Sequence, residues 1–275
     1  MSRVPDALLA AVLDALADSQ TARFDRVTVG GSAVLAELER TDGDSVTRSA
    51  GLAHRPPGPV PDAPPWERRS PREFAAAVVQ GAADRDEDST GNRLTRAVAV
   101  ATLNALSAPH VAWRTGDPMA HLDPGVAVVV TVGLFRPAFR KFRDVEVRVV
   151  ERERVGGVDA PDGVAVRAFT PDETAAAMAG ADVVFVTGST LVYGGIEGYL
   201  AAAPASATVV CVGATASLLP GPFFDAGVDV LAGAAVEDAD AARAAVAAGA
   251  CGTDLHDSGV RKVYVARDRH SDLGV

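Results

Sequence analysis

The chain has 275 residues and a formal net charge of −10, with 48% hydrophobic and 23% charged residues. This length is enough for two domains with sizeable cores, and the negative charge argues against a nucleic-acid or acidic-lipid surface. No apolar run reaches the roughly 18 residues that a membrane helix needs, and the N-terminus lacks the pattern of a cleaved signal peptide. We therefore expect a cytoplasmic globular protein that binds neither nucleic acid nor membrane.

The basic residues are almost all arginine, since Lys141 and Lys262 are the only lysines. High Asp, Ala and Val contents with so little Lys resemble the proteome of a halophilic archaeon, in which acidity keeps proteins hydrated in salt. We therefore do not interpret acidic clusters as metal sites. The two cysteines, Cys211 and Cys251, form no CxxC pair or disulfide framework. Cys211 is expected in the core as a small hydrophobic residue.

The first elements along the chain are a helix and a β-hairpin. The helix is expected from Pro5 to Ala17, because its leucines and its valine repeat on one face. Phe24–Val29 and Ala33–Leu38 flank Gly30-Gly31 and predict the hairpin. The two glycines are expected to supply a primed turn, which matches the twist of the strands.

A third strand and two helices are expected to follow. Ser45–Ala53 is predicted as the strand, and the proline-dense segment after it as a loop. Ser70-Pro71-Arg72-Glu73 has the spacing of a capping box and predicts a helix to about Gln80. Asn92 is expected to cap a further helix over residues 92–107. Together these elements predict a small α+β domain over residues 1–110.

Residues 111–275 are predicted to form an α/β domain, which begins with a connection over Val111–Pro124. Thr170-Pro171-Asp172-Glu173 is a second capping box, and Asp238 is expected to cap a helix that ends at Gly249. Short strands alternate with helices, which is typical of a doubly wound, mostly parallel sheet. The expected strands are Val126–Val132, Val145–Val150, Val183–Val186, Thr208–Val212, Val228–Leu231 and Arg261–Ala266.

Three of these strands, in the stretch from Asp182 to Val236, each run into a turn of small residues. The turns are Thr187–Thr190, Gly213–Ser217 and Gly233–Ala235. The strands are apolar without alternation, as parallel strands buried on both faces are. Ligands of open α/β sheets bind outside the carboxyl ends of the strands, so we expect the functional site on this edge.

The strongest candidate motif is Thr187-Gly188-Ser189-Thr190. A helix that begins near Thr190 would direct free N–H groups and its positive dipole end toward a ligand, and so form an anion site. The alternative is that the hydroxyls only cap the helix and Gly188 only makes the turn. The run from Gly213 to Pro220 leaves two alternatives open as well, because small residues permit either a close ligand approach or close packing.

Glu151 lies at the end of the second strand, which is the strand that follows Gly133. Dinucleotide-binding folds place an acidic residue at this position, and its carboxylate binds a ribose hydroxyl. The glycine fingerprint of those folds is missing, because Gly133-Leu134-Phe135-Arg136-Pro137 contains one glycine. A purine nucleoside or S-adenosylmethionine needs less glycine and stays an alternative. None of the five histidines forms a short metal-ligand pair. His54 could reach the site only if the first domain folds over it.

Three segments together resemble the family called "putative heavy-metal chelation", long known as a domain of unknown function. They are VTGSTLVYGGIEGYL, VGATASLLPGPFFDAGVDVLAGAAVED and VAVATLNALS. The resemblance covers essentially the whole chain. It implies a Rossmann-like C-terminal domain beside a smaller domain that is similar to the N-terminal domain of enolases, with a pocket between the two.

The resemblance also implies particular ligand-binding residues. Asn104 and Gly51-Leu52-Ala53 would close the pocket from the first domain, and Tyr193 stands where the family favours Asn. The residues implied on the sheet side are Thr187, Gly188, Ser189, Thr190, Gly213, Thr215, Pro220 and Gly233, with Gly133, Phe135 and Glu151 at the family's first turn and second strand end.

The first functional hypothesis is the binding of a small anionic or metal-chelating ligand in this pocket, which would include heavy-metal chelation. A bound metal ion would have oxygen ligands or arrive as a metal chelate, because soft side chains are lacking there. The second hypothesis is an enzyme that uses a nucleotide or S-adenosylmethionine at the same sheet edge. The third is a subunit that only scaffolds a partner. The sequence leaves the ligand, any reaction and homo-oligomerisation open.

Overall fold

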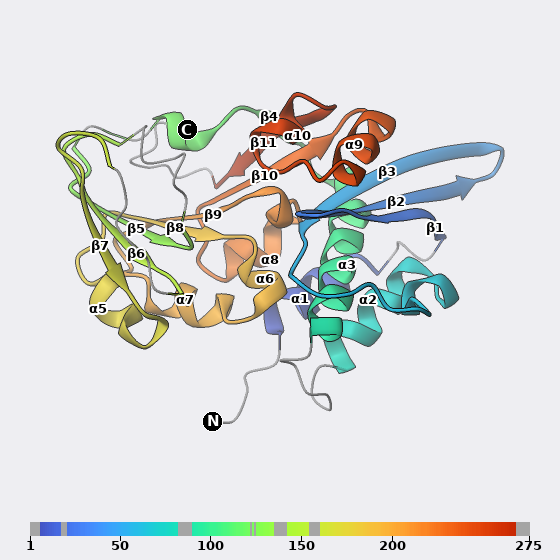
Figure 1. The fold of residues 1–275 in the computed structure, drawn as a ribbon, viewed down its shortest axis with the longest axis horizontal. Coiled ribbons are helices and arrows are strands. Elements are labelled where there is room, and N and C mark those ends of the chain that lie inside the picture. Colours follow the sequence, from blue (N-terminus) through green and yellow to red (C-terminus); the bar gives the residue numbers. More distant parts are fainter. Residues whose placement is uncertain are drawn as a thin grey trace.

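The computed structural model describes residues 6–17, 21–81, 90–121, 123, 125–134, 142–153 and 160–267. The chain folds around a three-stranded sheet and an eight-stranded sheet, with helices packed on both (Figure 1). The predicted α/β class, a mostly parallel sheet with a smaller α+β unit, is confirmed.

The small sheet is an antiparallel meander from the first part of the chain. Its strands are β1 (Ala22–Val29), β2 (Ala33–Asp42) and β3 (Ser45–His54). The predicted hairpin forms, but neither Gly30 nor Gly31 has the positive φ of the primed turn that the sequence predicts. Gly30 is required for packing instead, because a Cβ there would lie 2.0 Å from the main-chain oxygen of Val246.

Three helices pack around this sheet. They are α1 (Ala7–Ala15), α2 (Pro71–Gln80) and α3 (Thr90–Ser107). Helices α2 and α3 contact the strands and each other, and α1 packs on α2. The capping box of α2 forms as predicted: the Ser70 hydroxyl accepts from the Glu73 amide, and the Glu73 carboxylate accepts from the Ser70 amide over 3.1 Å.

Helix α3 is longer at its start than the sequence predicts. It begins at Thr90, so Asn92 lies inside the helix and is not its N-cap. The predicted inward face is confirmed, because Leu94, Val98 and Ala101 are all fully buried. This face joins α3 to the rest of the main hydrophobic core.

The large sheet combines parallel strands with an antiparallel edge. Strands β5, β6, β7, β8, β9 and β10 run parallel, and β11 and β4 add antiparallel pairs beside β10, in the order β4-β11-β10-β9-β8-β5-β6-β7. The bounds are β4 (Arg114–Thr115), β5 (Val128–Val132), β6 (Glu146–Val150), β7 (Ala165–Phe169), β8 (Val183–Thr187), β9 (Thr208–Val212), β10 (Val230–Val236) and β11 (Val260–Ala266).

Helices lie between and beside these strands. They are α5 (Thr174–Met178), α6 (Thr190–Tyr193), α7 (Ile196–Ala202), α8 (Pro220–Asp225), α9 (Ala239–Ala247) and α10 (Thr253–His256). The predicted capping box at Thr170 and Glu173 forms and leads through a 3-10 turn into α5. Asp238 caps α9 as predicted, accepting from the Ala241 amide over 3.0 Å. Within the described part of the chain, no helix combines the length and apolar character of a membrane span.

One hydrophobic cluster connects the two parts of the molecule. It runs from α1, α2 and α3 to one face of the large sheet and includes Leu103, Val186 and Leu231. A second cluster covers the opposite face of the large sheet, and a third joins the small sheet to α9. The proposed domain boundary after residue 110 stays a prediction, as does the likeness of residues 1–110 to the enolase N-terminal domain.

The sheet differs from the sequence-based prediction in three places. Strand β7 was not expected from the sequence, because its side chains are mostly exposed and an edge strand lacks the apolar signal. The connection at Val111–Pro124 contains β4. Strand β10 continues through Gly233 to Val236, because these residues pair with β11, so the turn predicted at Gly233–Ala235 is wrong.

Candidate functional site

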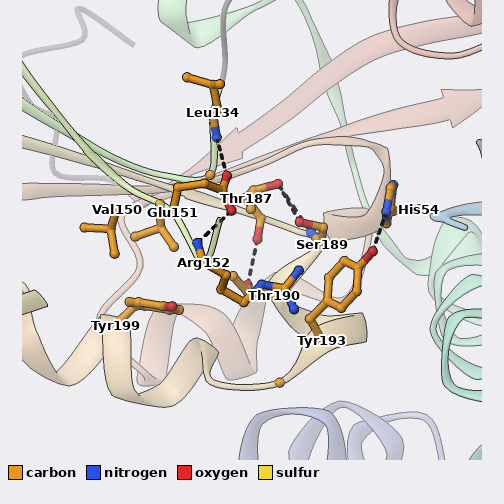
Figure 2. A pocket seen from close by; sticks show the side chains of 13 residues that line it. His54, Leu134, Val150, Glu151, Arg152, Thr187, Ser189, Thr190, Tyr193 and Tyr199 are labelled. Carbon is orange, nitrogen blue, oxygen red and sulfur yellow. Dashed lines mark hydrogen bonds between the residues drawn. The ribbon is translucent and has the colours of Figure 1, made fainter. Parts of the chain in front are cut away.

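A pocket of about 290 Å³ lies at the carboxyl ends of the central parallel strands (Figure 2). Strands β5, β6 and β8 end at it, α6 and α7 contribute tyrosines, and the end of β3 contributes a histidine. The lining residues are His54, Val132, Gly133, Leu134, Val150, Glu151, Arg152, Thr187, Ser189, Thr190, Tyr193, Gly194 and Tyr199.

The strand order explains this position. The chain proceeds from β5 outward through β6 to β7 and then returns to the other side of β5, where β8, β9 and β10 follow. The order in which strands are added therefore reverses between the parallel strands β5 and β8, and the turns after these two strands lead to opposite sides there. Such a reversal leaves a crevice at the carboxyl ends, where ligands of open α/β sheets bind.

The Thr187–Thr190 turn forms one wall of the pocket. The hydroxyls of Thr187 and Ser189 lie 3.2 Å apart, and the Thr190 hydroxyl donates to the main-chain oxygen of Thr187 over 2.6 Å. These bonds orient the small polar side chains at the end of β8. The turn is also the start of α6, as the sequence predicts.

The helix that begins at this turn is short. Helix α6 is a single four-residue turn, Thr190–Tyr193, and Gly194 and Gly195 end it with φ of 83° and 90°. A helix dipole needs several aligned peptide units. The dipole of α6 is therefore weak and the wall contributes mainly hydroxyls, while the anion site at this helix start stays a prediction.

Glu151 closes the pocket beside the end of β6. Its Oε2 accepts from the Leu134 amide over 3.1 Å, and its Oε1 accepts from the Arg152 amide over 2.9 Å (Figure 2). The carboxylate thus links the residues that follow β5 to those that follow β6. Glu151 fixes the shape of this corner and also presents a negative charge to it.

His54 and Tyr193 meet at the opposite end of the pocket. The His54 Nε2 lies 3.1 Å from the Tyr193 hydroxyl, and their rings are 5.6 Å apart (Figure 2). The His54 amide also donates to the Thr215 hydroxyl over 2.9 Å, which ties the end of β3 to the turn after β9. The small sheet therefore reaches over the large sheet far enough to bring His54 into the site.

Arg152 supplies the positive charge of the pocket. Its guanidinium carbon lies 3.8 Å from the centroid of the Tyr193 ring, a cation–π contact. Burial lowers the pKa of His54, and the neighbouring Arg152 charge lowers this pKa further. His54 is therefore a neutral imidazole at pH 7.

Tyr199 contributes a second phenol from α7. Burial raises the pKa of Tyr199; the Arg152 charge opposes this rise, and the Glu151 charge adds to it. The phenol is therefore protonated near neutral pH and offers a hydroxyl to a ligand.

Six of the residues predicted to bind ligand line this pocket, and the sequence missed two polar ones. The predicted residues are Gly133, Glu151, Thr187, Ser189, Thr190 and Tyr193. The missed residues are Arg152 and Tyr199, and His54, for which the sequence left this position open, lines the pocket as well. Arg152 and Tyr199 are close in sequence to predicted ones, but a sequence does not show where a long side chain points. Phe135 lies outside the described residues.

Three of the predicted glycines, Gly188, Gly213 and Gly233, and also Pro220 lie outside the lining of the pocket. A Cβ at Gly188 would lie 2.8 Å from the Ala216 amide nitrogen, and one at Gly233 would lie 2.5 Å from the Ser217 hydroxyl. Gly213 adopts φ of 117° at the end of β9. Pro220 begins α8. Close packing therefore explains Gly188 and Gly233, whereas the two alternatives for the run from Gly213 to Pro220 stay open.

Asn104 and Thr215 support the pocket without lining it. Both are buried, and the Asn104 Nδ2 donates to the main-chain oxygens of Leu52 over 2.7 Å and Thr215 over 3.0 Å. Asn104 borders a separate hollow of about 510 Å³ between the small sheet and β10. Asn104 therefore does not line the pocket at the strand ends, and its role in closing a ligand pocket stays a prediction, while its side chain joins α3, β3 and the turn after β9.

Comparison with known proteins identifies the family. The family model DUF364, described as "putative heavy-metal chelation", matches residues 117–265, which is more than half of the chain. The chain belongs to this family. No curated protein matches the sequence.

Two solved DUF364 structures share this fold, and both proteins have unknown function. The protein from Pyrococcus horikoshii aligns with a TM-score of 0.74 and 20% sequence identity over 94% of this chain and 100% of its own. The protein from Desulfitobacterium hafniense DCB-2 aligns with a TM-score of 0.69 and 17% identity over 94% of this chain and 98% of its own. At these identities the likeness concerns the fold.

The described residues of this DUF364 protein do not fit a heavy-metal centre built from side chains. Among them, no three His, Cys, Asp or Glu side chains gather closely enough to hold a metal ion. Cys211 is enclosed in β9, where burial raises its pKa to about 12, and Cys251 is exposed outside the pocket. The thiolates that soft metal ions prefer are therefore not supplied by the described pocket residues.

Proposed function

We propose that this DUF364 protein binds a small anionic or metal-chelating ligand in the pocket where β5, β6 and β8 end. One observation carries the proposal. Arg152, His54 and Tyr193 come from three separate parts of the chain and converge on one hollow at the reversal of the strand order. Polar groups that converge in a concave site at a sheet edge are the usual mark of a ligand site.

The chemistry of the pocket favours an oxygen-rich anion. Arg152 offers a guanidinium, which suits carboxylate and phosphate groups. The hydroxyls of Thr187, Ser189, Tyr193 and Tyr199 can donate to or accept from further oxygens. Small hydroxycarboxylates and dicarboxylates combine these features, and both classes chelate metal ions.

The same chemistry suggests how metal chelation would occur. Because the described residues do not assemble a metal centre of their own, the metal would be held by the ligand and the ligand by the protein. In this arrangement Arg152 and the hydroxyls recognise the organic anion. Heavy-metal chelation would then be a property of the complex.

Isothermal titration calorimetry tests this proposal. Citrate, oxalate, malonate and phosphate would each be titrated alone and, for the three carboxylates, with Zn²⁺ or Ni²⁺. Arg152→Gln removes the charge that faces the pocket, and we expect it to weaken binding at least tenfold. The matched control is Arg261→Gln. Arg261 lies on β11 and forms an exposed ion pair with Glu237, so this variant removes the same charge from a site outside the pocket. Equal affinity in the two variants, or no binding of any anion or chelate, would contradict the proposal.

A second candidate function is an enzyme that uses a nucleotide or S-adenosylmethionine. The observation in its favour is Glu151, which follows the second parallel strand beside the pocket, where dinucleotide folds place a ribose-binding acid. Both oxygens of Glu151 already accept main-chain N–H groups, but each retains acceptor capacity. A thermal-shift screen of adenine compounds tests this candidate, since a ligand at a hundred times its Kd adds about 2.7 kcal/mol. Unchanged melting with every adenine compound would remove it.

A further inference from the structure

The contact between His54 and Tyr193 places a titratable group inside the proposed anion site. The imidazole Nε2 is 3.1 Å from the phenol oxygen, and both side chains line the pocket. The main chain of His54 is fixed, because its amide donates to the Thr215 hydroxyl and it pairs with Ala33 at the end of β3, and its imidazole is held in the pocket by the contact with Tyr193. Any anion that enters the pocket therefore approaches this imidazole.

The charges around His54 explain its state before a ligand binds. The Tyr193 ring, which contacts His54, has two arginines beside it. The guanidinium carbon of Arg152 lies 3.8 Å from the ring centroid, and that of Arg93 on α3 lies 5.8 Å from it. Glu151 lines the pocket but is engaged by two main-chain amides, and Tyr199 is a neutral phenol. On the turn after β9, Thr215 presents a hydroxyl that carries no charge.

We propose that the natural ligand is a small dianion and that His54 takes up one proton when this dianion binds. Arg152 would then meet one negative charge of the ligand and the His54 imidazolium the other. This inference rests on the proposed function and deepens it, because it selects dicarboxylates and phosphate-like ligands over monoanions.

The direction of proton uptake follows from the electrostatics of the site. In the free protein the burial of His54 and the Arg152 charge disfavour the imidazolium. A dianion partly neutralises Arg152 and adds an attractive charge, and an opposite charge within about 4–6 Å favours the charged form of a group. The pKa of His54 therefore rises on binding, and one proton enters from solvent at any pH between the free and bound values.

Two consequences separate this mechanism from simple anion binding. Affinity for a dianion should rise about tenfold for each pH unit of acidification between the two His54 pKa values, because one proton is coupled to binding. A monoanion such as acetate, which Arg152 alone can neutralise, should bind weakly and with little proton uptake.

Calorimetry of malonate binding in two buffers of different ionisation enthalpy measures the number of protons taken up. The wild-type chain should take up close to one proton near neutral pH. The His54→Gln variant should still bind malonate, with a lower affinity than the wild type, and should take up almost no proton. His256→Gln is the matched control, because His256 lies on α10, outside the lining of the pocket, and its ring faces the Val260 main-chain oxygen.

The outcomes distinguish the two proposals. Malonate binding without proton uptake, or equal uptake in His54→Gln, would overturn the role of His54 and leave the anion site intact. Equal affinity for acetate and malonate would overturn the selection of dianions. If none of malonate, oxalate, citrate and phosphate binds, the anion site itself is wrong and this inference falls with it.

Discussion

The side chain of Asn104 donates to the main-chain oxygen of Thr215 over 3.0 Å, although 111 residues separate them. The same amide donates to Leu52 over 2.7 Å. Asn104 therefore fastens α3 to β3 and to the turn after β9. The turn after β9 also holds His54, because the His54 amide donates to the Thr215 hydroxyl.

Asn104→Ala is expected to destabilise the protein by about 1–3 kcal/mol, because it leaves buried carbonyl oxygens without donors. Urea unfolding followed by circular dichroism measures this change. Thr95→Ala is the matched control in α3, since its hydroxyl donates to the Gly91 main-chain oxygen of the same helix. A loss no larger than that of the control would show that Asn104 does not fasten these elements.

Gly51 sets the distance between α3 and the small sheet. A Cβ at this position would lie 2.3 Å from the Ala105 amide nitrogen and 2.4 Å from the Ala101 main-chain oxygen. Gly51→Ala should therefore cost about 1–3 kcal/mol or more through overpacking. The control is Gly81→Ala at the end of α2, where an added Cβ meets nothing within 4 Å and φ is −85°. Similar melting temperatures for the two variants would contradict the close contact.

Arg96 joins α3 to two other helices. Its guanidinium donates to the Asp6 carboxylate over 2.7 Å and to the Leu191 main-chain oxygen of α6 over 2.7 Å. The side chains of Arg96 and Asp6 are each only 15% exposed, so Arg96→Gln leaves a largely buried carboxylate unpaired and should cost about 1–3 kcal/mol. The exposed Arg261→Gln should cost less than about 1 kcal/mol. Denaturant unfolding of both variants decides between these values, and equal costs would contradict the buried link.

The two capping boxes predict how stability depends on pH. Hydrogen bonds from Ser70 lower the pKa of Glu73, and hydrogen bonds from Thr170 lower the pKa of Glu173, both below the ordinary value of 4.5. A carboxyl whose folded pKa is depressed stabilises the fold above its unfolded pKa. This contribution is lost as the pH falls from about 4.5 through the folded values. The Glu73→Gln, Glu173→Gln double variant should therefore lose less stability than the wild type between pH 5 and about 3, as measured by urea midpoints. Parallel pH curves would contradict this account.

Much of the fold could be predicted from the sequence, because its signals are local. The capping boxes and the apolar strands that begin at Val128, Val183 and Thr208 are each specified within a few residues. Strand β7 was missed because its exposed edge carries no apolar run. The end of β10 was missed because Gly233 fits either a turn or a strand that packs closely on Ser217.

The candidate site could be predicted only in part, because it depends on long-range packing. The sequence identifies Thr187 and Glu151, since both follow predicted parallel strands. His54 enters the site only because the meander folds over the large sheet, and Arg152 only because its side chain turns toward Tyr193. Neither fact is encoded in the spacing of neighbouring residues.

The central claim is that the pocket at the ends of β5, β6 and β8 binds a small anion. Chemical-shift mapping of the ¹⁵N-labelled chain during a malonate titration tests it most directly. We expect saturable shifts that cluster on the amides of Leu134, Arg152 and Ser189 and on the ring of His54. Saturable shifts centred on another part of the surface, or none at concentrations that saturate dicarboxylate sites, would contradict it.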